Sequence, residues 1–256
     1  MKQLVKKLLI RILKPVNARL GFHSVNLNLE KNLSSKDTLL NNFFLVLKQI
    51  NFNPVHIVDI GANHGTWTRE AIKYFPKVYY SLLEPQYWLK DSITDLLEGY
   101  ENVQFYALGA GAAAGKFKFT IVNRDDSCSF RYSKEQAALK GFTQLDLPME
   151  RLDTFLTERN LPLPGIVKID AEGLDLEVLK GSGSYLGKTE VFMVEAAVNN
   201  MHLDNTVLSV IDFLDQKGYR LFDITDINRP YKPPFLWLVE LVFIKKGGFI
   251  SNNIIV

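Results

Sequence analysis

Lys168, Asp170 and Glu172 stand at alternate positions at the end of an apolar run that begins at Gly165. Such a run predicts a buried strand, and its charges come where the strand ends. In open α/β folds, ligands bind at the carboxyl ends of the parallel strands. The spacing therefore favours a functional site over a purely structural network of ion pairs.

A second group of residues predicts a nucleoside-binding site. The β-branched run from Val55 ends in Asp59 and a turn with Gly61 and Gly65, and Glu84 follows 23 positions after Gly61. Glycines let a backbone approach a ligand closely, and the start of the following helix offers free N–H groups. A carboxylate at the end of the second strand is where doubly wound folds hold two ribose hydroxyls.

The same turn indicates which nucleoside is bound. It lacks the three glycines of the dinucleotide fingerprint, and the chain has no P-loop, so no pyrophosphate is expected. The carboxylate of Asp59 favours a ligand with an ammonium or sulfonium group. S-adenosylmethionine fits best. The alternatives are a nicotinamide-dependent oxidoreductase and a plain turn between strand and helix.

The elements that position these residues follow a strand–helix–strand rhythm, which predicts an α/β fold. An antiparallel strand is expected at 116–122, and a polar surface loop with a short helix, long enough to act as a lid, at 123–141. The last two strands have no helix between them and should be antiparallel. Strands are expected at 55–60, 78–83, 103–108, 165–170, 190–195, 219–224 and 235–244. Helices are expected at 38–50, 65–75, 87–97, 174–179 and 207–217. In the helix at 174–179, helical spacing turns Leu176 and Leu179 inward and predicts that Asp175 faces solvent.

Several motifs in a fixed order resemble the FkbM family of S-adenosylmethionine-dependent methyltransferases. They are Val58–Asn63 with Gly65, Glu84-Pro85, Ala107–Gly109, Leu152-Asp153, Lys168–Gly173 and Val178–Gly181. The resemblance implies a Rossmann-like class I methyltransferase with a seven-stranded, mostly parallel sheet and one antiparallel strand. It also implies methyl transfer to a hydroxyl of a sugar or a polyketide-type product. The chain departs from the family at Leu174-Asp175 and at Cys128.

The resemblance assigns cofactor-binding positions as well. They are Asp59, Gly61, Asn63, Gly65, Glu84, Ala107, Leu108 and Asp170. Asp59, Gly61 and Gly65 would shape the pocket for the methionine part, with Asn63 hydrogen-bonding near it. Glu84 would hold the ribose, and the adenine would lie near Ala107 and Leu108.

A hydroxyl acceptor needs a general base, because an alcohol is a poor nucleophile until its proton is removed. Asp170 is the first candidate, followed by Glu195 and His202, while His64 is a weaker one. Lys168 completes the candidate catalytic set. Asp170, Glu195 and Asn199 or Asn200 could offer oxygen ligands to Mg²⁺. Spacing does not establish that they converge, so no metal ligand is assigned.

The N-terminus carries an uneven charge. Six basic residues precede the first acid, Glu30. Apolar residues recur at helical spacing between Leu4 and Leu13, with Lys7, Arg11 and Lys14 opposite them, which predicts a short amphipathic helix that ends near Pro15. Residues 23–256 contain 24 of the 30 Lys and Arg residues and all 28 acidic residues, so this part of the chain has a net charge of −4. We therefore divide the chain into a basic helical arm (1–50) and a methyltransferase domain (51–256). The arm either lies on an anionic membrane surface or packs on the body or on a second subunit.

These observations predict an O-methyltransferase that acts on a saccharide, a glycolipid or another small hydroxyl compound. A total charge of +2 and a single cysteine indicate no nucleic-acid partner and a cytoplasmic protein. Residues 1–22 would give peripheral contact with the inner leaflet, and a homo-oligomer is left open. The non-enzymatic alternative is an adenosyl-binding module at the membrane surface.

Overall fold

A computed structural model describes residues 38–199 and 204–254 of the chain. The basic amphipathic helix expected before Pro15 lies outside these residues, as does His202. None of the helices in the described ranges is long and apolar enough to cross a membrane.

The centre of the fold is a seven-stranded sheet with the order β3-β2-β1-β7-β8-β10-β9. Only β10 runs antiparallel to its neighbours, β8 and β9, within this sheet. Its strands are β1 (His56–Ile60), β2 (Tyr79–Leu83), β3 (Val103–Tyr106), β7 (Ile166–Ile169), β8 (Val191–Ala197), β9 (Tyr219–Asn228) and β10 (Leu238–Lys245). The predicted parallel strands and the antiparallel final pair are therefore confirmed.

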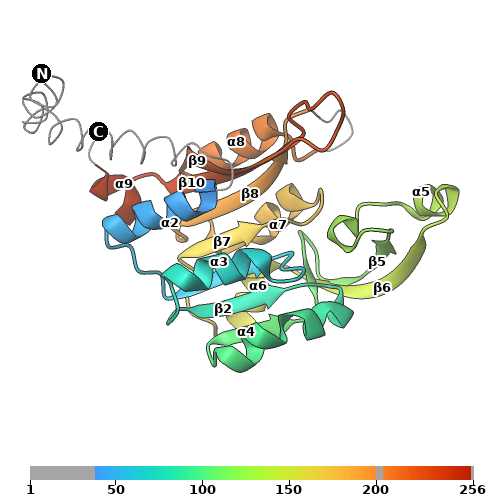
Figure 1. The fold of residues 1–256 in the computed structure, drawn as a ribbon, viewed down its shortest axis with the longest axis horizontal. Coiled ribbons are helices and arrows are strands. Elements are labelled where there is room, and N and C mark those ends of the chain that lie inside the picture. The colour runs from blue at the N-terminus through green and yellow to red at the C-terminus, as the bar shows by residue number, and fades with distance from the viewer. Residues whose placement is uncertain (1–37, 200–203, 255–256) are drawn as a thin grey trace, which may run out of the picture.

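Helices cover both faces of the sheet (Figure 1). One face packs against α2 (Leu39–Gln49), α3 (Thr66–Tyr74), α4 (Thr94–Gly99) and α9 (Phe249–Asn253). The other packs against α6 (Leu152–Glu158), α7 (Asp175–Gly181) and α8 (Val207–Gln216). Burial on both faces explains why β1 and β7 read as continuous apolar runs instead of alternating patterns.

Two segments differ from their sequence predictions. The single helix expected at 87–97 is a 3₁₀ turn, η2 (Tyr87–Ile93), followed by α4. The hydroxyls of Ser92 and Thr94 donate to the carbonyls of Leu89 and Asp91, and such bonds compete with regular helix formation. Helix α6 was not predicted. It is only seven residues long, and three of its side chains are buried.

A smaller sheet projects from the body at the carboxyl edge of the main sheet (Figure 1). It contains β4 (Gly109–Ala110), β5 (Gly115–Ile121) and β6 (Thr143–Glu150), in the order β4-β6-β5. The antiparallel strand expected at 116–122 is β5, although its partner β6 was not predicted. Between them lie η3 (Asp125–Ser127) and α5 (Lys134–Leu139), as expected for a loop with a short helix.

Helix α2 is joined to the main sheet through its apolar face. Phe43, Phe44 and Leu47 are fully buried there, and Phe44 contacts Trp67 and Phe75 edge-on. The described part of the predicted arm is thus packed on the body. The division of the chain at residue 50 stays a prediction.

Candidate active site

The turn after β1 brings the ends of three strands together. Gly61 has a φ of +74°, and a Cβ atom there would lie 1.8 Å from the carbonyl oxygen of Asp170, so only glycine fits. The amides of Gly61 and Ala62 both donate to the carbonyl of Leu83 at the end of β2. The turn is therefore fixed between β7 on one side and β2 on the other.

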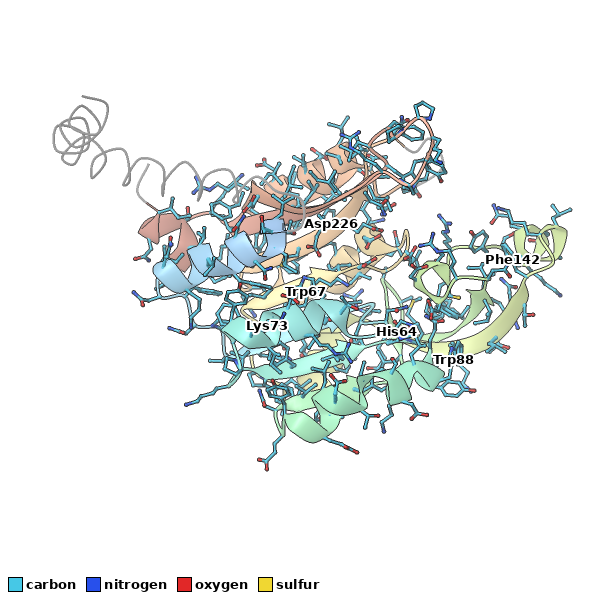
Figure 2. The ribbon with its side chains drawn as sticks, viewed as in Figure 1. His64, Trp67, Lys73, Trp88, Phe142 and Asp226 are labelled. Atoms are coloured by element: carbon cyan, nitrogen blue, oxygen red, sulfur yellow. The ribbon has the colours of Figure 1, made fainter. Side chains whose placement is uncertain are left out.

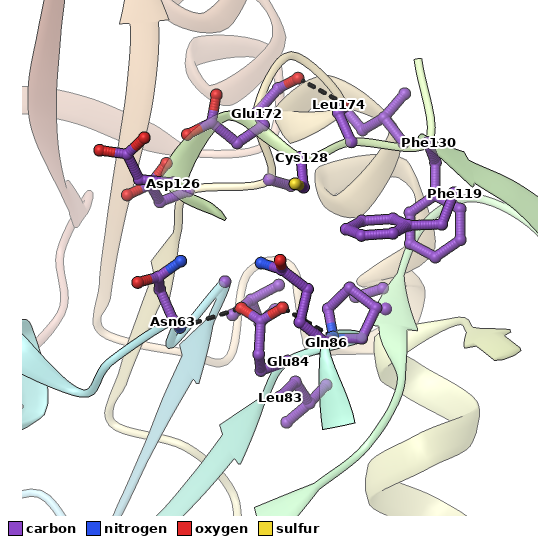
Figure 3. A pocket seen from close by; sticks show the side chains of 18 of the residues that line it. Asn63, Leu83, Glu84, Gln86, Phe119, Asp126, Cys128, Phe130, Glu172 and Leu174 are labelled. Atoms are coloured by element: carbon purple, nitrogen blue, oxygen red, sulfur yellow. Dashed lines mark hydrogen bonds between the residues drawn. The ribbon is translucent and has the colours of Figure 1, made fainter. Parts of the chain in front are cut away.

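Glu84 is held at the end of β2 by backbone donors from both sides. Its two carboxylate oxygens accept from the amides of Asn63 and Gln86, each at 2.9 Å (Figure 3). The residue is 3% exposed, and burial raises the pKa of its carboxyl group while these hydrogen bonds oppose the rise. The carboxylate is thus fixed in one orientation.

Glu84 lies on the wall of a pocket of about 580 Å³, which we call the cofactor pocket. Its charged and amide-bearing lining residues include Asn63, Glu84, Gln86, Asp170 and Glu172. The apolar wall comes from the end of β2, from the smaller sheet and its loop, and from the segment before α7 (Figure 3). It includes Leu83, Pro85, Ala110, Phe119, Phe130 and Leu174.

The apolar wall differs from the prediction at one place. Gly109 and Ala110 line the pocket, whereas Ala107 and Leu108 do not. Leu108 is buried in the core on the sheet face covered by α6, α7 and α8, and Ala107 is exposed. The Phe130 ring packs directly on Gly109, where a Cβ atom would lie 2.5 Å from it. The pocket wall thus lies two residues further along the chain than the positions expected near the adenine, and the adenine contact itself stays a prediction.

The loop predicted to act as a lid makes three contacts beside the cofactor pocket. His64 Nε2 and the Asp125 carboxylate are hydrogen-bonded at 2.7 Å, and the amide of the Gln86 side chain donates to the carbonyl of Asp125. The Ser129 hydroxyl donates to the carbonyl of Glu172 at 2.9 Å. His64 is consequently engaged with the lid. Residues from η3 to Phe130 then form one side of the pocket.

Lys168 is the buried cation of the site. Its ammonium lies 3.2 Å from Asp170, 3.4 Å from Asp59 and 3.3 Å from the carbonyl oxygen of Gly61. Burial alone would lower the pKa of Lys168, but the two carboxylates raise it above its ordinary value. The ammonium therefore stays charged and ties β1 to β7.

Asp59 and Asp170 use this cation differently. Asp59 is fully buried, also accepts from the Thr68 hydroxyl at 2.6 Å, and lines neither pocket. Asp59 therefore lies behind Lys168, off the pocket walls, and its role in shaping the methionine site stays a prediction. The Asp170 side chain is 36% exposed and lines both the cofactor pocket and the neighbouring groove.

That groove, which we call the acceptor groove, has a volume of about 1850 Å³ and runs between the sheet and helices α2 and α3. Figure 2 labels four residues on its walls, His64, Trp67, Lys73 and Asp226. The cofactor pocket and the groove share Gly61, Asn63, Asp125, Asp126 and Asp170. A group bound at this junction would be open to both spaces.

A protein-family model described as "Methyltransferase FkbM domain" matches residues 59–221, more than half of the chain. The chain belongs to the FkbM methyltransferase family. It is therefore a methyltransferase that uses S-adenosylmethionine, as its motifs predicted, and the seven-stranded sheet is the Rossmann-like sheet of such enzymes. The nicotinamide-dependent oxidoreductase and the non-enzymatic binding module are set aside. A comparison with curated proteins gave no match.

Solved methyltransferase structures resemble this FkbM enzyme over most of its length. Precorrin-6y C5,15-methyltransferase from Geobacter metallireducens is 16% identical, with a TM-score of 0.44, covering 80% of this chain and 88% of that one. The 1,6-didemethyltoxoflavin-N1-methyltransferase of Burkholderia thailandensis, solved with S-adenosylhomocysteine, is 12% identical, with a TM-score of 0.43 and coverage of 91% and 88%. Putative methyltransferase yhhF from Escherichia coli is 11% identical, with a TM-score of 0.46 and coverage of 83% and 89%.

Other candidate residues of the FkbM enzyme fall in different places. Glu195 lines the acceptor groove with Lys168 and Asp170, whereas Asn199 is exposed and lines neither space. Asn200 and His202 lie outside the described residues. Within the described ranges, no three His, Cys, Asp or Glu side chains are placed to hold a metal ion.

Asp175 was expected to face solvent but is fully buried. Its carboxylate accepts from the amides of Ala171 and Gly173 and from the side chain of Asn205, which fixes the segment that carries Glu172. Glu172 itself has a positive φ of 50°, a conformation that costs energy for a residue other than glycine. The helical pattern misplaced Asp175 because it is the first residue of α7, where a side chain can turn back to the preceding loop.

Sequence reasoning also missed Thr225, Asp226 and Glu240 in the acceptor groove. Glu240 is the only charged residue between Leu236 and Ile244, which is a signal for a special position in a buried strand. Its carboxylate accepts a hydrogen bond from Thr225.

Buried carboxyl groups should make the stability of the ligand-free enzyme fall as the pH rises. Burial, with nearby carboxylates, raises the pKa of Glu172 to about 8, and burial is the largest cause that raises that of Glu240 to about 7. The folded state thus binds these protons more tightly than the unfolded chain. Their stabilisation is complete below about pH 4.5 and is lost as the pH rises through about 7 to 8.

We expect the melting temperature to fall between about pH 6 and about pH 8.5 in thermal-shift measurements. The fall should be smaller in a Glu172→Gln, Glu240→Gln double variant, and unchanged in Glu98→Gln, which alters an exposed acid on α4. A melting temperature that rises over this range would contradict the assignment of buried protons.

Proposed function

We propose that this enzyme transfers a methyl group from S-adenosylmethionine to a hydroxyl of a saccharide or glycolipid. The observation that supports this proposal most directly is the position of Asp170. Its partly exposed carboxylate lines both the cofactor pocket and the acceptor groove, and Lys168 fixes it from the buried side. A carboxylate at this junction can accept a proton from an acceptor hydroxyl as the oxygen is methylated.

The lining of the cofactor pocket fits S-adenosylmethionine. The fixed Glu84 carboxylate suits two adjacent ribose hydroxyls, because each oxygen has lone pairs beyond the one used for a backbone N–H. Phe119, Phe130 and Pro85 supply an apolar surface for a purine. The Asp170 carboxylate suits the positive charge of a sulfonium. When bound, this cofactor supplies an electrophilic methyl group, so alignment by the protein provides much of the rate.

The groove favours a hydroxylated acceptor on two grounds. It is lined mainly by polar and charged side chains, including Asn41, Thr66, Thr225 and Asn228. The buried indole N–H of Trp67, which also lines the groove, has no hydrogen-bond partner among the described residues. An acceptor oxygen would satisfy this donor.

Replacing Glu84 by Gln should weaken binding of S-adenosylhomocysteine, because one of two charged acceptors for the ribose is exchanged for an amide. Hydrogen bonds to charged groups contribute about 1.5–3 kcal/mol, so we expect affinity to fall by about 10-fold to 100-fold in calorimetric titration. Glu98→Gln removes a distant exposed acid and should bind normally. Unchanged affinity in Glu84→Gln would remove the ribose assignment.

Asp170→Asn should separate binding from turnover. The amide is similar in shape but cannot take the hydroxyl proton, so turnover on a glycan panel should fall by about 10²-fold to 10⁴-fold. Binding of S-adenosylhomocysteine should change far less. Asp91→Asn, an exposed site on η2, serves as the matched control. If Asp170→Asn keeps full activity, or if mass spectrometry places the methyl on nitrogen or carbon, the proposal is wrong.

The basic arm extends the proposal to membrane-bound acceptors. Residues 1–22 carry six Lys and Arg before the first acid of the chain, whereas the remainder is acidic, so the arm is the segment suited to an anionic surface. We expect the full chain to sediment with phosphatidylserine vesicles and not with phosphatidylcholine vesicles. Deletion of residues 1–22 should abolish this, and undiminished sedimentation would rule the arm out as the anchor.

A further inference from the structure

Three carboxyl groups form a row across three neighbouring strands on the wall of the acceptor groove. Glu195 lies on β8, Glu240 on β10 and Asp226 on β9. In the strand register, Glu240 is the direct partner of both Glu195 and Asp226. Directly paired residues of an antiparallel sheet have Cβ atoms about 4.5–5.5 Å apart, and like charges there destabilise the sheet.

The described cations of the groove do not form ion pairs with this row. Lys168 is within 4 Å of Asp59 and Asp170, and Lys73 is paired with Glu70 on α3. Glu240 accepts from the neutral Thr225 hydroxyl. Among the residues that the structure describes, no hydrogen bond or ion pair holds the carboxyl group of Glu195 or of Asp226.

Glu195 is the group that most clearly lacks a partner. It is only partly exposed to water, and it lines the groove. Burial and the charge of Asp170 both raise its pKa, whereas the charge of Lys168 lowers it. A carboxyl that is largely removed from water and has no partner is uncommon unless a ligand supplies one.

We propose that the Glu195–Glu240–Asp226 row binds a protonated amine of the acceptor, so that the substrate is an amino sugar or another amine-bearing hydroxyl compound. The inference rests on the proposed function. A metal ion fits the row less well, because the described residues hold no set of three carboxyl, imidazole or thiol groups with suitable placement. A larger cation with three N–H donors can reach carboxyls on successive strands.

Such binding also agrees with methylation on oxygen. An amine held between carboxylates keeps its proton and is not a nucleophile, which leaves a hydroxyl of the same molecule to react. Ile169 of β7 pairs with Val194 of β8. Asp170 and Glu195 each follow their strand's paired residue by one position, so they lie beside each other on neighbouring strands. The amine site therefore adjoins the carboxylate that we assign as the base.

The test compares two disaccharides that differ only in charge, the β-1,4-linked dimer of glucosamine and its N,N′-diacetyl form. Each is added to the full-length enzyme saturated with S-adenosylhomocysteine, so that the ammonium of the cofactor is already in place. We expect only the free-amine form to raise the melting temperature. The apparent affinity should fall by about tenfold or more in Glu240→Gln and in Asp226→Asn.

Asp226 is exposed, so Asp226→Asn keeps the test valid if Glu240→Gln fails to fold. Glu158→Gln, an exposed acid on α6 of the opposite sheet face, should behave as the wild type. Equal shifts from both disaccharides, no shift from either, or an undiminished shift in the two variants would overturn the inference. So would a shift by MgCl₂ alone that Glu240→Gln abolishes. The shift caused by S-adenosylhomocysteine itself and the site of methylation report separately on the proposed function.

Discussion

The buried ammonium of Lys168 is the interaction on which the rest of the site depends. It stands between β1 and β7, with the carboxylate of Asp59 on one side, that of Asp170 on the other, and the carbonyl of Gly61 in reach. Removing one partner of such a group leaves a buried charge uncompensated, which costs several kcal/mol, on the order of 3–5. This cation therefore fixes the turn after β1 and the orientation of Asp170 together.

The same cation explains how so many acids can share one edge of the sheet. Asp59 and Asp170 lie within 4 Å of Lys168. Glu172, Glu195 and Glu240 have raised pKa values, because burial and neighbouring carboxylates oppose their ionisation, and the charge of Lys168 offsets part of the rise for Glu195 and Glu240. Strain at Glu172 and the burial of these carboxyl groups are costs that the hydrophobic core on both faces of the sheet offsets.

Local motifs made much of this fold predictable. Turn glycines, apolar runs and the acid at the end of β2 lie within short stretches of sequence, so Gly61, Glu84, Lys168 and Asp170 could be assigned to one edge. Two smaller differences have separate causes. Asp175 turns back from the first position of α7, which is a local effect, whereas the Phe130 ring, distant in sequence, packs on Gly109 in the pocket wall.

The acidic row could not be predicted in the same way, because it depends on which strands are neighbours. β10 enters the sheet between β8 and β9 and runs against both, so Glu240 meets Glu195, which lies 45 positions earlier, and Asp226 across a proline-rich loop. In the sequence each acid belongs to a separate strand with its own apolar pattern. The antiparallel strand that completes the sheet thus also places a third carboxyl between two others. A sheet closed by a parallel strand would reverse the direction of this segment and put a different residue opposite Glu195.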